Sequence, residues 1–459
     1  MPHAAYDVLD PATLEVVGQA PEHTEDDVRT AIGTARAAAA PWAADREARR
    51  ATLRGMAELV RADTERLGRI LSLEQGKVLA EAIGEFRVAA GLFDYYADLE
   101  WDEVEPLPPR GGRTLEVHYR PVGLVGTITP WNFPISLLCV KLAPALVAGC
   151  TVVAKPSATT PLSTIALVEV LNRALPPGVL QVRTGSRRTV NVALSSLPGI
   201  RKISFTGSTE VGTSVAAQAA ATVKRVTLEL GGNDPAIVLD DADAETTARG
   251  IVGSAFRNAG QVCMAVKRVY VPRRRAAEFA EAISAAAAAH VLGRGIAEGT
   301  TLGPMHNASQ LRIVRSMVDD AVASGARIAT GGSRGCDLPG YFLAPTVVVD
   351  AEPGMRLVDE EQFGSALPIV AYDDLDATVE HVNAGEFGLG ASVWSPDPVR
   401  AHSVASQLEA GTVWVNQHTV VEPDAPFGGW KASGLGRERG RWGLDEYLET
   451  RTLNMRAHA

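Results

Sequence analysis

The sequence predicts an α/β protein of at least two domains, and two observations lead to this fold class. From residue 121 onward, short apolar runs alternate with segments of helical length, as in the successive strand–helix–strand units of a parallel sheet. The chain also has 459 residues, which exceeds the size at which a single hydrophobic core keeps growing. The first set of strand-like runs is VGLVGTIT, CTVVAKPS, GVLQVRTG, KISFTG and RVTLEL.

Before these runs, residues 24–100 predict helices, because apolar residues recur at spacings of three and four. Thr24 and Asp63 are the expected N-caps. Residues 101–120 break this pattern with a Pro- and Gly-rich connector that leads into alternating, strand-like residues. We expect this connector to be either a linker or an interface arm.

A second set of strand-like runs begins at Ala236 and comprises AIVLDDAD, RVYVP, APTVVVD, LPIVAYDD, ASVWS and GTVWVN. The Ala-rich stretch over residues 276–292 lies among them and predicts a helix. We therefore expect a second α/β domain, and this domain contains Cys263.

Composition and charge exclude several classes of protein. The net charge is −10 and Lys and Arg are dispersed, so a nucleic-acid-binding surface is not expected. The cysteines are widely spaced without a CxxC pair, which argues against a disulfide framework and a metal site and fits a reducing cytoplasm. They are Cys139, Cys150, Cys263 and Cys336. Neither a leader peptide nor a run of ~18 apolar residues is found, so we expect no export and no membrane span.

Cys263 is the candidate nucleophile. It follows the small and polar residues Asn-Ala-Gly-Gln-Val, which leave room for a substrate carbonyl, and nearby backbone N–H groups can lower the pKa of its thiol. The alternative is a buried, inert cysteine, since free cysteines are among the most buried residues.

Polar or glycine-containing turns follow several predicted strands, at the ends where open α/β sheets bind ligands. Asn132 either directs its amide at an oxyanion or closes a local turn, and Lys155 is a candidate for a phosphate or ribose contact. The segment Gly207–Gly212 lacks the full GxGxxG but precedes a helix whose N-terminus favours an anion. Glu229 is either a general base acting on water or a capping or salt-bridged acid.

These segments occur in the order and approximate spacing of the aldehyde dehydrogenase superfamily, which the chain resembles from about Asp10 to Leu453. The motifs that carry the resemblance are PWNFP, KPS, FTGSTEVG, ELGGN, NAGQVC, EEQFG and PFGGWKASGLGRE. The implied architecture is a Rossmann-type nucleotide-binding domain over residues 1–102 and 122–231, an α/β catalytic domain over residues 232–432, and a small oligomerisation arm and tail over residues 103–121 and 433–459.

By this resemblance, the protein oxidises an aldehyde to a carboxylic acid with NAD or NADP. The thiolate of Cys263 would attack the aldehyde carbon, and the Asn132 side chain and the Cys263 backbone N–H would hold the oxyanion. Hydride transfer would leave a thioester, which water activated by Glu229 would hydrolyse. Lys141 and Glu438 match positions that relay protons away from this glutamate in related enzymes; the alternatives are a surface lysine and a salt-bridged glutamate.

The resemblance also implies a set of cofactor contacts. Lys155 would reach the adenine ribose, Ser208 the pyrophosphate and Glu361 the nicotinamide ribose. The remaining candidates are Trp131, Ser157, Gly207, Gly212 and Phe363. The family often has a glutamate after KPS that would repel a 2′-phosphate, whereas this chain has Ala158, so NAD and NADP both stay open.

Two substrate classes stay open as well. Arg257 precedes Cys263 by six residues, where succinate-semialdehyde dehydrogenases have an arginine for the substrate carboxylate. A second arginine of that group is replaced by Val140, and together with Leu137 and Val421 this valine predicts an aliphatic tunnel that favours an apolar aldehyde. Polar residues expected near its mouth are Glu422, Asp424 and His418.

Two other functions are compatible with parts of the pattern. A CoA-acylating dehydrogenase passes the acyl group to CoA, but that branch tends to lack the carboxylate found here at Glu229. A catalytically silent NAD(P)-binding structural protein would keep the fold without turnover, whereas Cys263, Asn132 and Glu229 are intact. The tail segment Thr450–Met455 predicts an edge strand, and the resemblance implies a homodimer or homotetramer.

Overall fold

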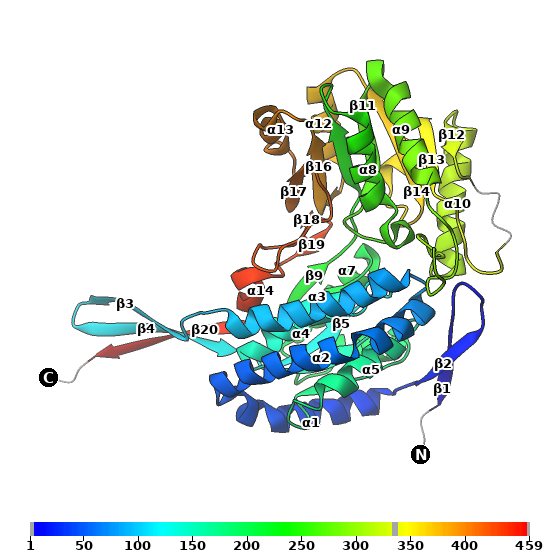
Figure 1. Ribbon diagram of the computed structural model, residues 1–459. Helices are drawn as coiled ribbons and strands as arrows, with labels where there is room; N and C mark the ends of the chain where they lie inside the picture. Colours follow the sequence, from blue (N-terminus) through cyan, green and yellow to red (C-terminus); the bar gives the residue numbers. More distant parts are fainter. Residues whose placement is uncertain (1–3, 333–337, 457–459) are drawn as a thin grey trace.

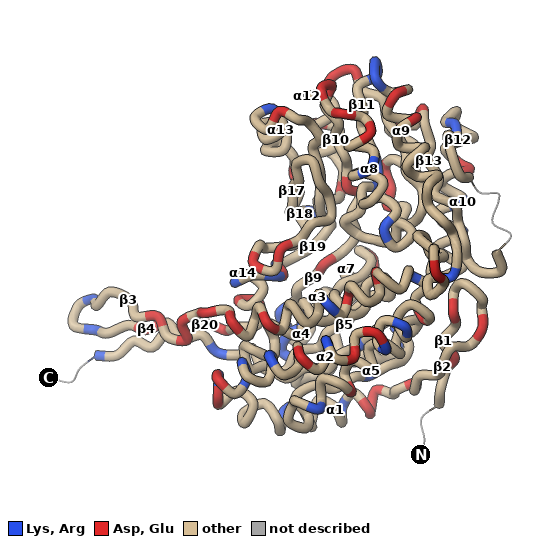
Figure 2. The backbone as a smooth tube through the Cα atoms, viewed as in Figure 1, with Lys and Arg blue, Asp and Glu red and all other residues tan. Residues whose placement is uncertain are grey.

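The computed structural model describes residues 4–332 and 338–456, so the predicted free cysteine Cys336 lies outside the described residues. Two large sheets, each covered by helices, form the body of the protein, and a narrow three-stranded arm projects from it (Figure 1). The large sheets are mostly parallel, which confirms the predicted α/β class. Acidic and basic residues are interspersed along the outer helices (Figure 2).

The first sheet has six strands, and all neighbours pair in parallel except at one edge. In sheet order its strands are β19 (Gly434–Leu435), β9 (Arg225–Glu229), β8 (Lys202–Thr206), β5 (Leu124–Ile128), β6 (Thr151–Lys155) and β7 (Leu180–Val182). Their carboxyl ends carry Lys155, Thr206 and Glu229, so the topology gathers these residues at one edge of the sheet.

Helices cover both faces of this sheet. Val152 and Ala154 of β6 belong to one core, while Val153 belongs to the other. Because the strand is buried on both faces, its three central residues are all apolar. The helices are α1 (Glu25–Ala43), α2 (Arg46–Gln75), α3 (Leu79–Asp98), α4 (Ser136–Ala148), α5 (Leu162–Leu171), α6 (Val192–Ser196) and α7 (Thr209–Ala220), with a π-helical turn at Arg187–Asn191.

The second sheet has seven strands, again parallel except at one edge. In sheet order they are β12 (Arg327–Thr330), β13 (Thr346–Ala351), β14 (Ala366–Tyr372), β11 (Val266–Pro272), β10 (Asp234–Val238), β16 (Gly390–Trp394) and β17 (Thr412–Val415). Its helices are α8 (Ala244–Ala255), α9 (Ala276–Ala288), α10 (Ala308–Ala323), α11 (Arg356–Asp359), α12 (Leu375–Ala384) and α13 (Pro398–Ala405). Val269 faces one core and Tyr270 the other, so this sheet is also buried on both sides.

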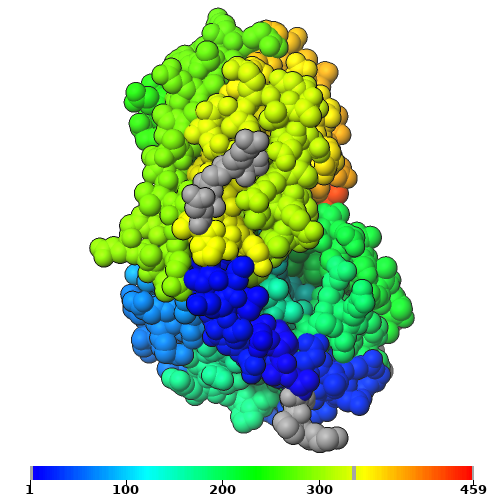
Figure 3. All heavy atoms as spheres, turned by 90° about the vertical axis from the view of Figure 1, so that its right-hand side faces the viewer, coloured from blue at the N-terminus to red at the C-terminus, as the bar shows by residue number. Residues whose placement is uncertain are grey.

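The N-terminal hairpin connects the two sheet units. It consists of β1 (Ala5–Leu9) and β2 (Val16–Pro21), and its turn lies against the second unit, as the dark blue segment in Figure 3 shows. Asp10 accepts an ion pair from Arg294 at 3.0 Å, and the Tyr341 N–H donates to the Pro11 carbonyl at 2.9 Å. These contacts hold the two units together on the side that Figure 3 presents.

The arm is a three-stranded antiparallel sheet in the order β20 (Leu448–Arg456), β4 (Arg113–Pro121) and β3 (Val104–Arg110). Residues 101–120 and the C-terminal segment are therefore partners, and β20 is an edge strand, as the tail pattern predicted. β15 (Phe387–Gly388) and β18 (Trp430–Lys431) form a two-stranded antiparallel sheet, and α14 (Gly440–Asp445) directly precedes β20.

One of the two predicted N-caps is correct. Thr24 caps α1 in a capping box with Asp27. Asp63 is not a cap, because it lies inside the continuous helix α2, whose N-cap is Asp45. The Asp63 carboxylate instead pairs with Arg66 one turn later, a helix-surface contact that local sequence does not distinguish from a cap.

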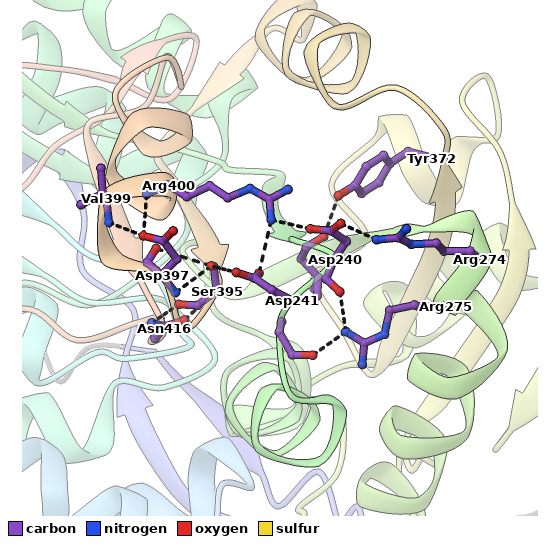
Figure 4. Close-up of polar contacts among 12 residues, drawn as sticks. Asp240, Asp241, Arg274, Arg275, Tyr372, Ser395, Asp397, Val399, Arg400 and Asn416 are labelled. Atoms are coloured by element: carbon purple, nitrogen blue, oxygen red, sulfur yellow. Dashed lines mark hydrogen bonds and ion pairs between the residues drawn. The ribbon is translucent and has the colours of Figure 1, made fainter.

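The Arg273–Arg275 segment, a 3₁₀ turn, belongs to an ion-pair network at the end of β10 remote from Asp234 (Figure 4). The Asp240 carboxylate pairs with Arg274 and Arg400, while Arg275 donates to the Asp240 carbonyl at 3.0 Å. Because each of these guanidinium groups has a partner, the cluster stabilises the loops at this end of the sheet.

Two buried carboxylates cap helices from a distance. The helices α4 and α5 have no side-chain N-cap of their own. Glu74 of α2 accepts from the Leu162 and Ser163 N–H groups at 2.7 and 2.9 Å, and Glu85 of α3 accepts from the Ile135 and Ser136 N–H groups at 3.2 and 3.1 Å. A carboxylate at a helix N-terminus satisfies orphan donors and complements the helix dipole. The outer helices thereby orient the two helices that follow the strand-end turns of Asn132 and Lys155.

The Glu74 cap predicts a specific pH dependence of stability. Burial raises the pKa of Glu74 to about 7, whereas a glutamate in an unfolded chain titrates near ~4.3. The folded state therefore binds this proton more tightly, so the stability contribution is fully present below ~4.3 and is lost as the pH rises through about 7. Relative to Glu74→Gln, the free energy of unfolding of the wild type should fall by about 2–3 kcal/mol between about pH 5 and about pH 8.

Urea unfolding of both proteins at the two pH values measures this difference. Glu65→Gln, on the exposed side of α2, is the control and should track the wild type at both. Parallel curves for wild type and Glu74→Gln would show that Glu74 does not titrate in this range.

Candidate active site

Two cavities meet at Cys263, at the junction of the two sheet units. The first cavity, of about 230 Å³, reaches the turn after β8, and the second, of about 340 Å³, reaches α4 and the C-terminal segment. Cys263, Asn132 and Thr206 line both cavities. A ligand in one cavity can therefore meet a ligand in the other at the sulfur of Cys263.

The loop that presents Cys263 is locally strained. Asn258, Ala259 and Gly260 have successive positive φ values of 47°, 54° and 73° in the turn before the cysteine. A Cβ at Gly260 would lie 2.2 Å from the Gly364 carbonyl oxygen, so only glycine fits there. Other positive-φ residues that line the cavities are Phe363, Thr419 and Arg439. Such strain gathers at functional sites because the surrounding structure over-determines the backbone.

Asn132 is held beside this loop by three hydrogen bonds. Its side-chain amide donates to the Gln261 carbonyl at 2.9 Å. The main-chain carbonyl of Asn132 accepts from the Asn258 side chain at 3.0 Å and from the Lys77 ammonium at 2.6 Å. One of the two amide hydrogens is therefore engaged, and the other is left to donate to a group at Cys263. The structure thus brings together the two predicted oxyanion-stabilising residues.

The environment of Cys263 keeps its sulfur protonated. Burial raises the pKa of the thiol to about 12, and the carboxylates of Glu361, Asp234 and Glu229 add to this effect. The ammonium of Lys267 opposes them. Cys139 and Cys150 are fully buried, whereas Cys263 is partly accessible. Among the described cysteines, Cys263 is therefore the one that a ligand can reach.

Glu229 ends β9 and lies beside the second cavity with both carboxylate oxygens free of hydrogen bonds to the described residues. Burial raises its pKa well above the usual value, and the charge of Glu438 adds to this. Lys141 pairs with Glu438 and donates to Thr206 at 2.7 Å. Lys141 is fully buried, so the alternative of a surface lysine is wrong, whereas the salt bridge expected as the alternative for Glu438 is present.

The first cavity has the features of a dinucleotide site. Gly207 and Ser208 line it, and the Ser208 side chain caps α7, whose N-terminus attracts an anion such as a pyrophosphate. Gly212 lies within α7, where a Cβ would come 2.3 Å from Leu230. Glu361 lines the cavity beside Gly231, whose missing Cβ makes room for that carboxylate, and burial raises the Glu361 pKa to about 7.

Aromatic rings close the same cavity. Trp131 stacks on His306 at 4.7 Å and meets Phe363 edge-on at 5.5 Å. His306 also bonds to Thr159 at 2.7 Å, so it connects the tryptophan to the turn after β6. The sequence analysis did not identify His306, since a single histidine in a loop carries no local signal.

Lys155 and Ser157 lie beyond the lining of the first cavity. The buried ammonium of Lys155 has no hydrogen-bond or ion-pair partner among the described residues, and burial lowers its pKa to about 8. A buried cation without a partner is suited to a hydroxyl or phosphate of a ligand. The Ser157 hydroxyl bonds to Thr159 at 3.1 Å next to it. The residues present therefore fit NAD or NADP.

The second cavity combines apolar walls with cationic groups. Leu137, Val140 and Val421 line it as predicted, and Arg257 lines it above the Phe133 ring at 5.4 Å. His418 is not at its mouth, contrary to expectation. It is buried 3.5 Å from the Asp234 carboxylate, because the chain turns inward at this point.

Lys267 was also missed, although a signal for it exists. It is a fully buried charge in strand β11, next to the buried Arg268, and its ammonium donates to the Gly260 carbonyl at 3.1 Å. A lysine inside an apolar strand pattern marks a buried polar interaction.

The described ranges, 4–332 and 338–456, show neither a cluster of metal-ligating side chains nor a membrane-spanning helix. No group of three or more metal-ligating side chains is found there. No helix in these ranges is long and apolar enough to cross a membrane.

The chain is similar to known proteins over almost its whole length. The model of the aldehyde dehydrogenase family matches residues 2–453. Glutarate-semialdehyde dehydrogenase of Pseudomonas putida is 40% identical over 97% of this chain and 93% of its own, and the NADP-dependent succinate-semialdehyde dehydrogenase GabD of Escherichia coli is 40% identical over 98% and 94%. The crystal structure of betaine aldehyde dehydrogenase from Staphylococcus aureus in complex with NAD+ has a TM-score of 0.96 at 34% identity, covering 99% of this chain and 93% of the other.

The raised pKa of Cys263 predicts how the thiol reacts with iodoacetamide. Because only the thiolate reacts, the alkylation rate at Cys263 should rise about tenfold per pH unit between about pH 7 and about pH 10 without a plateau. Peptide mapping by mass spectrometry after timed alkylation of the ligand-free protein measures this rate. Cys263→Ser is the control for peptide assignment, and a plateau near neutral pH would contradict the electrostatic description of the site.

Proposed function

This chain belongs to the aldehyde dehydrogenase family, and we propose that its substrate is an aldehyde with an anionic group at the end remote from the carbonyl. The protein oxidises an aldehyde with NAD or NADP as acceptor. The observation that carries the proposal is Arg257. Its guanidinium lines the same cavity as Cys263 and has no hydrogen bond or ion pair to any described residue.

Charge and chemistry support this class. Succinate and glutarate semialdehyde, named for the two relatives, each carry a carboxylate. An arginine offers a carboxylate two parallel charge-assisted hydrogen bonds. In this cavity the carboxylate of Glu85 is already engaged by Lys77, and that of Glu438 by Lys141. Glu229 is the carboxylate of this cavity that has no partner among the described residues, and Arg257 is available there to an anionic substrate.

We assign the catalytic roles by position. The Cys263 thiolate adds to the carbonyl carbon, and the free amide hydrogen of Asn132 together with the Cys263 N–H receives the oxyanion. NAD or NADP, when bound, supplies the hydride acceptor. The acyl group then remains on Cys263 as a thioester until Glu229, once deprotonated, removes a proton from the attacking water. Lys141 and Glu438 give that proton a buried route away from Glu229.

The cofactor contacts are part of the same proposal. Ser208 at the start of α7 holds the pyrophosphate, and Glu361 holds a ribose beside the catalytic cysteine. Lys155 and the neighbouring Ser157 take the second ribose, where Ala158 contributes no carboxylate that would repel a 2′-phosphate. Further contacts come from Trp131, Gly207, Gly212 and Phe363.

A second candidate is an apolar aldehyde. The side chains of Leu137, Val140 and Val421 make much of the wall of the second cavity, and burial of alkyl surface there is worth ~25 cal/mol per Å². The two candidates differ in the ratio of kcat/KM for an anionic aldehyde to that for a neutral aldehyde of the same length.

We also propose a homodimer or homotetramer in the cytoplasm. The edge strand β20 lies on a projecting arm, where pairing with another subunit would cover it. The described cysteines Cys139, Cys150 and Cys263 are all free, as expected in a reducing compartment. We keep residues 232–432 as the catalytic domain, residues 1–102 and 122–231 as the nucleotide-binding domain, and the remainder as the oligomerisation element.

Removing the Arg257 guanidinium tests the substrate class. In Arg257→Leu, the ratio of kcat/KM for succinate semialdehyde to that for butanal should fall by about 10- to 100-fold, since charge-assisted hydrogen bonds contribute about 1.5–3 kcal/mol. Reduced-cofactor absorbance with each aldehyde measures it. The control is Arg249→Leu on the exposed face of α8. A wild-type ratio near one would instead favour the apolar aldehyde.

Replacing Glu229 tests the hydrolytic step. Glu229→Gln should lower the steady-state rate by about 10²-fold or more, because the thioester loses its general base. Rapid mixing should then show a burst of reduced cofactor close to one per active site, and acyl-enzyme should be recovered at Cys263 by mass spectrometry. An unaltered steady-state rate without a burst would remove Glu229 from this role, and relief by CoA in the wild type would favour the acylating alternative.

A further inference from the structure

Arg439 has an unusual backbone for an arginine. It lies directly after Glu438 with φ 69°, a left-handed conformation that non-glycine residues adopt rarely. Hydrogen bonds hold the chain on both sides of it. Glu438 and Phe427 exchange two main-chain hydrogen bonds, at 2.7 and 2.9 Å. The Gly440 N–H donates to the Pro423 carbonyl at 2.8 Å, and the Arg439 carbonyl accepts from the Gly443 N–H at 2.7 Å. The surrounding structure therefore imposes this conformation on the residue.

The side chain of Arg439 has no partner. Arg439 lines the second cavity, and its guanidinium makes no hydrogen bond or ion pair with any described residue. The arginines on either side differ, because Arg437 donates to the Gly436 carbonyl at 2.6 Å and Arg441 pairs with Asp445 at 2.6 Å. Half-burying a guanidinium without an acceptor is unfavourable, so the free donors of Arg439 are suited to a ligand.

Three carboxylates act on the charge of Arg439 without a hydrogen bond or ion pair to it. They belong to Glu438, Glu422 and Glu229. Glu438 is committed to Lys141, and burial raises the pKa of Glu229. Burial lowers the pKa of Arg439, but an arginine stays charged in proteins. Arg257 and Arg439 thus present two free cations to one cavity from distant parts of the chain.

We propose that Arg439 is a second anion-binding residue of the substrate cavity, which together with Arg257 selects aldehydes bearing a carboxylate or sulfonate. This inference rests on the proposed function of the same site and adds a specificity-determining residue to it. The strained backbone aims the side chain at the cavity. The alternative is that Arg439 only balances the charge of Glu438 and Glu229, in which case its loss changes the oxidation of anionic and neutral aldehydes alike.

Three variants of the full-length protein separate these readings. Arg439→Gly suits φ 69° and ψ 162° and removes the charge, Arg439→Asn removes the charge at a non-glycine residue, and Arg439→Lys keeps the charge without the planar fork. Arg441→Gly is the matched control, since that arginine is paired with Asp445 and is not among the residues that line the cavity. Each is assayed with succinate semialdehyde against butanal and with glutarate semialdehyde against pentanal, and its Tm is measured.

For Arg439→Gly and Arg439→Asn we expect the anionic-to-neutral ratio of kcat/KM to fall at least tenfold, mostly through KM, with a smaller fall for Arg439→Lys. The Tm of Arg439→Gly should rise, because the backbone strain is relieved. A ratio within twofold of the wild type in both variants overturns the inference. The Arg257 variant distinguishes the two proposals. If the anionic-to-neutral ratio of kcat/KM falls in Arg257→Leu alone, the proposed function stands and the inference about Arg439 is wrong. If the ratio falls in the Arg439 variants alone, the inference stands and Arg257 is not the anchor.

Discussion

The buried ion pair between Lys77 and Glu85 is the interaction on which the site depends. The Lys77 ammonium donates to Glu85 and to the Asn132 carbonyl, while Glu85 accepts from the first turn of α4. The Asn132 carbonyl also accepts from Asn258 in the cysteine loop. One pair in the outer helical layer thus joins α3, α4, the asparagine and the loop of the nucleophile. Breaking a buried pair leaves an uncompensated charge, so each member of this chain of contacts constrains the next.

Electrostatics around the nucleophile follow from the same packing. Carboxylates of Glu229, Asp234 and Glu361 surround a sulfur that burial already disfavours as a thiolate, and Lys267 is the cation that opposes them. Burial likewise raises the pKa of Glu229, and the charge of Glu438 adds to this effect. The ionisation of Cys263 and Glu229 is therefore a collective property of both sheet units.

The residues that the sequence identified and the residues that it missed differ in kind. Asn132, Glu229 and Cys263 stand in local motifs, the first two after strands and the third in the loop before β11, and the structure brings all three to one place. His306 and Arg439 carry no such local pattern. His306 matters through its contacts with Trp131 and Thr159, and Arg439 through the cavity that it lines, and both involve distant parts of the chain. Asp63 shows the opposite error. Its residue type is typical of an N-cap, but it lies inside the long helix α2 and pairs with Arg66 on the helix surface.

The sequence by itself determined the α/β class, the helical N-terminal region, the edge strand of the tail and the catalytic motifs, because these depend on local periodicity and on short segments. Only the tertiary structure decided which charges are paired. Lys141 with Glu438, Lys77 with Glu85, and the unpaired Arg257 and Arg439 look alike in the sequence. Pairing depends on distances between segments that lie far apart along the chain, and this is the physical reason why the charge of the substrate cavity could be read only from the folded protein.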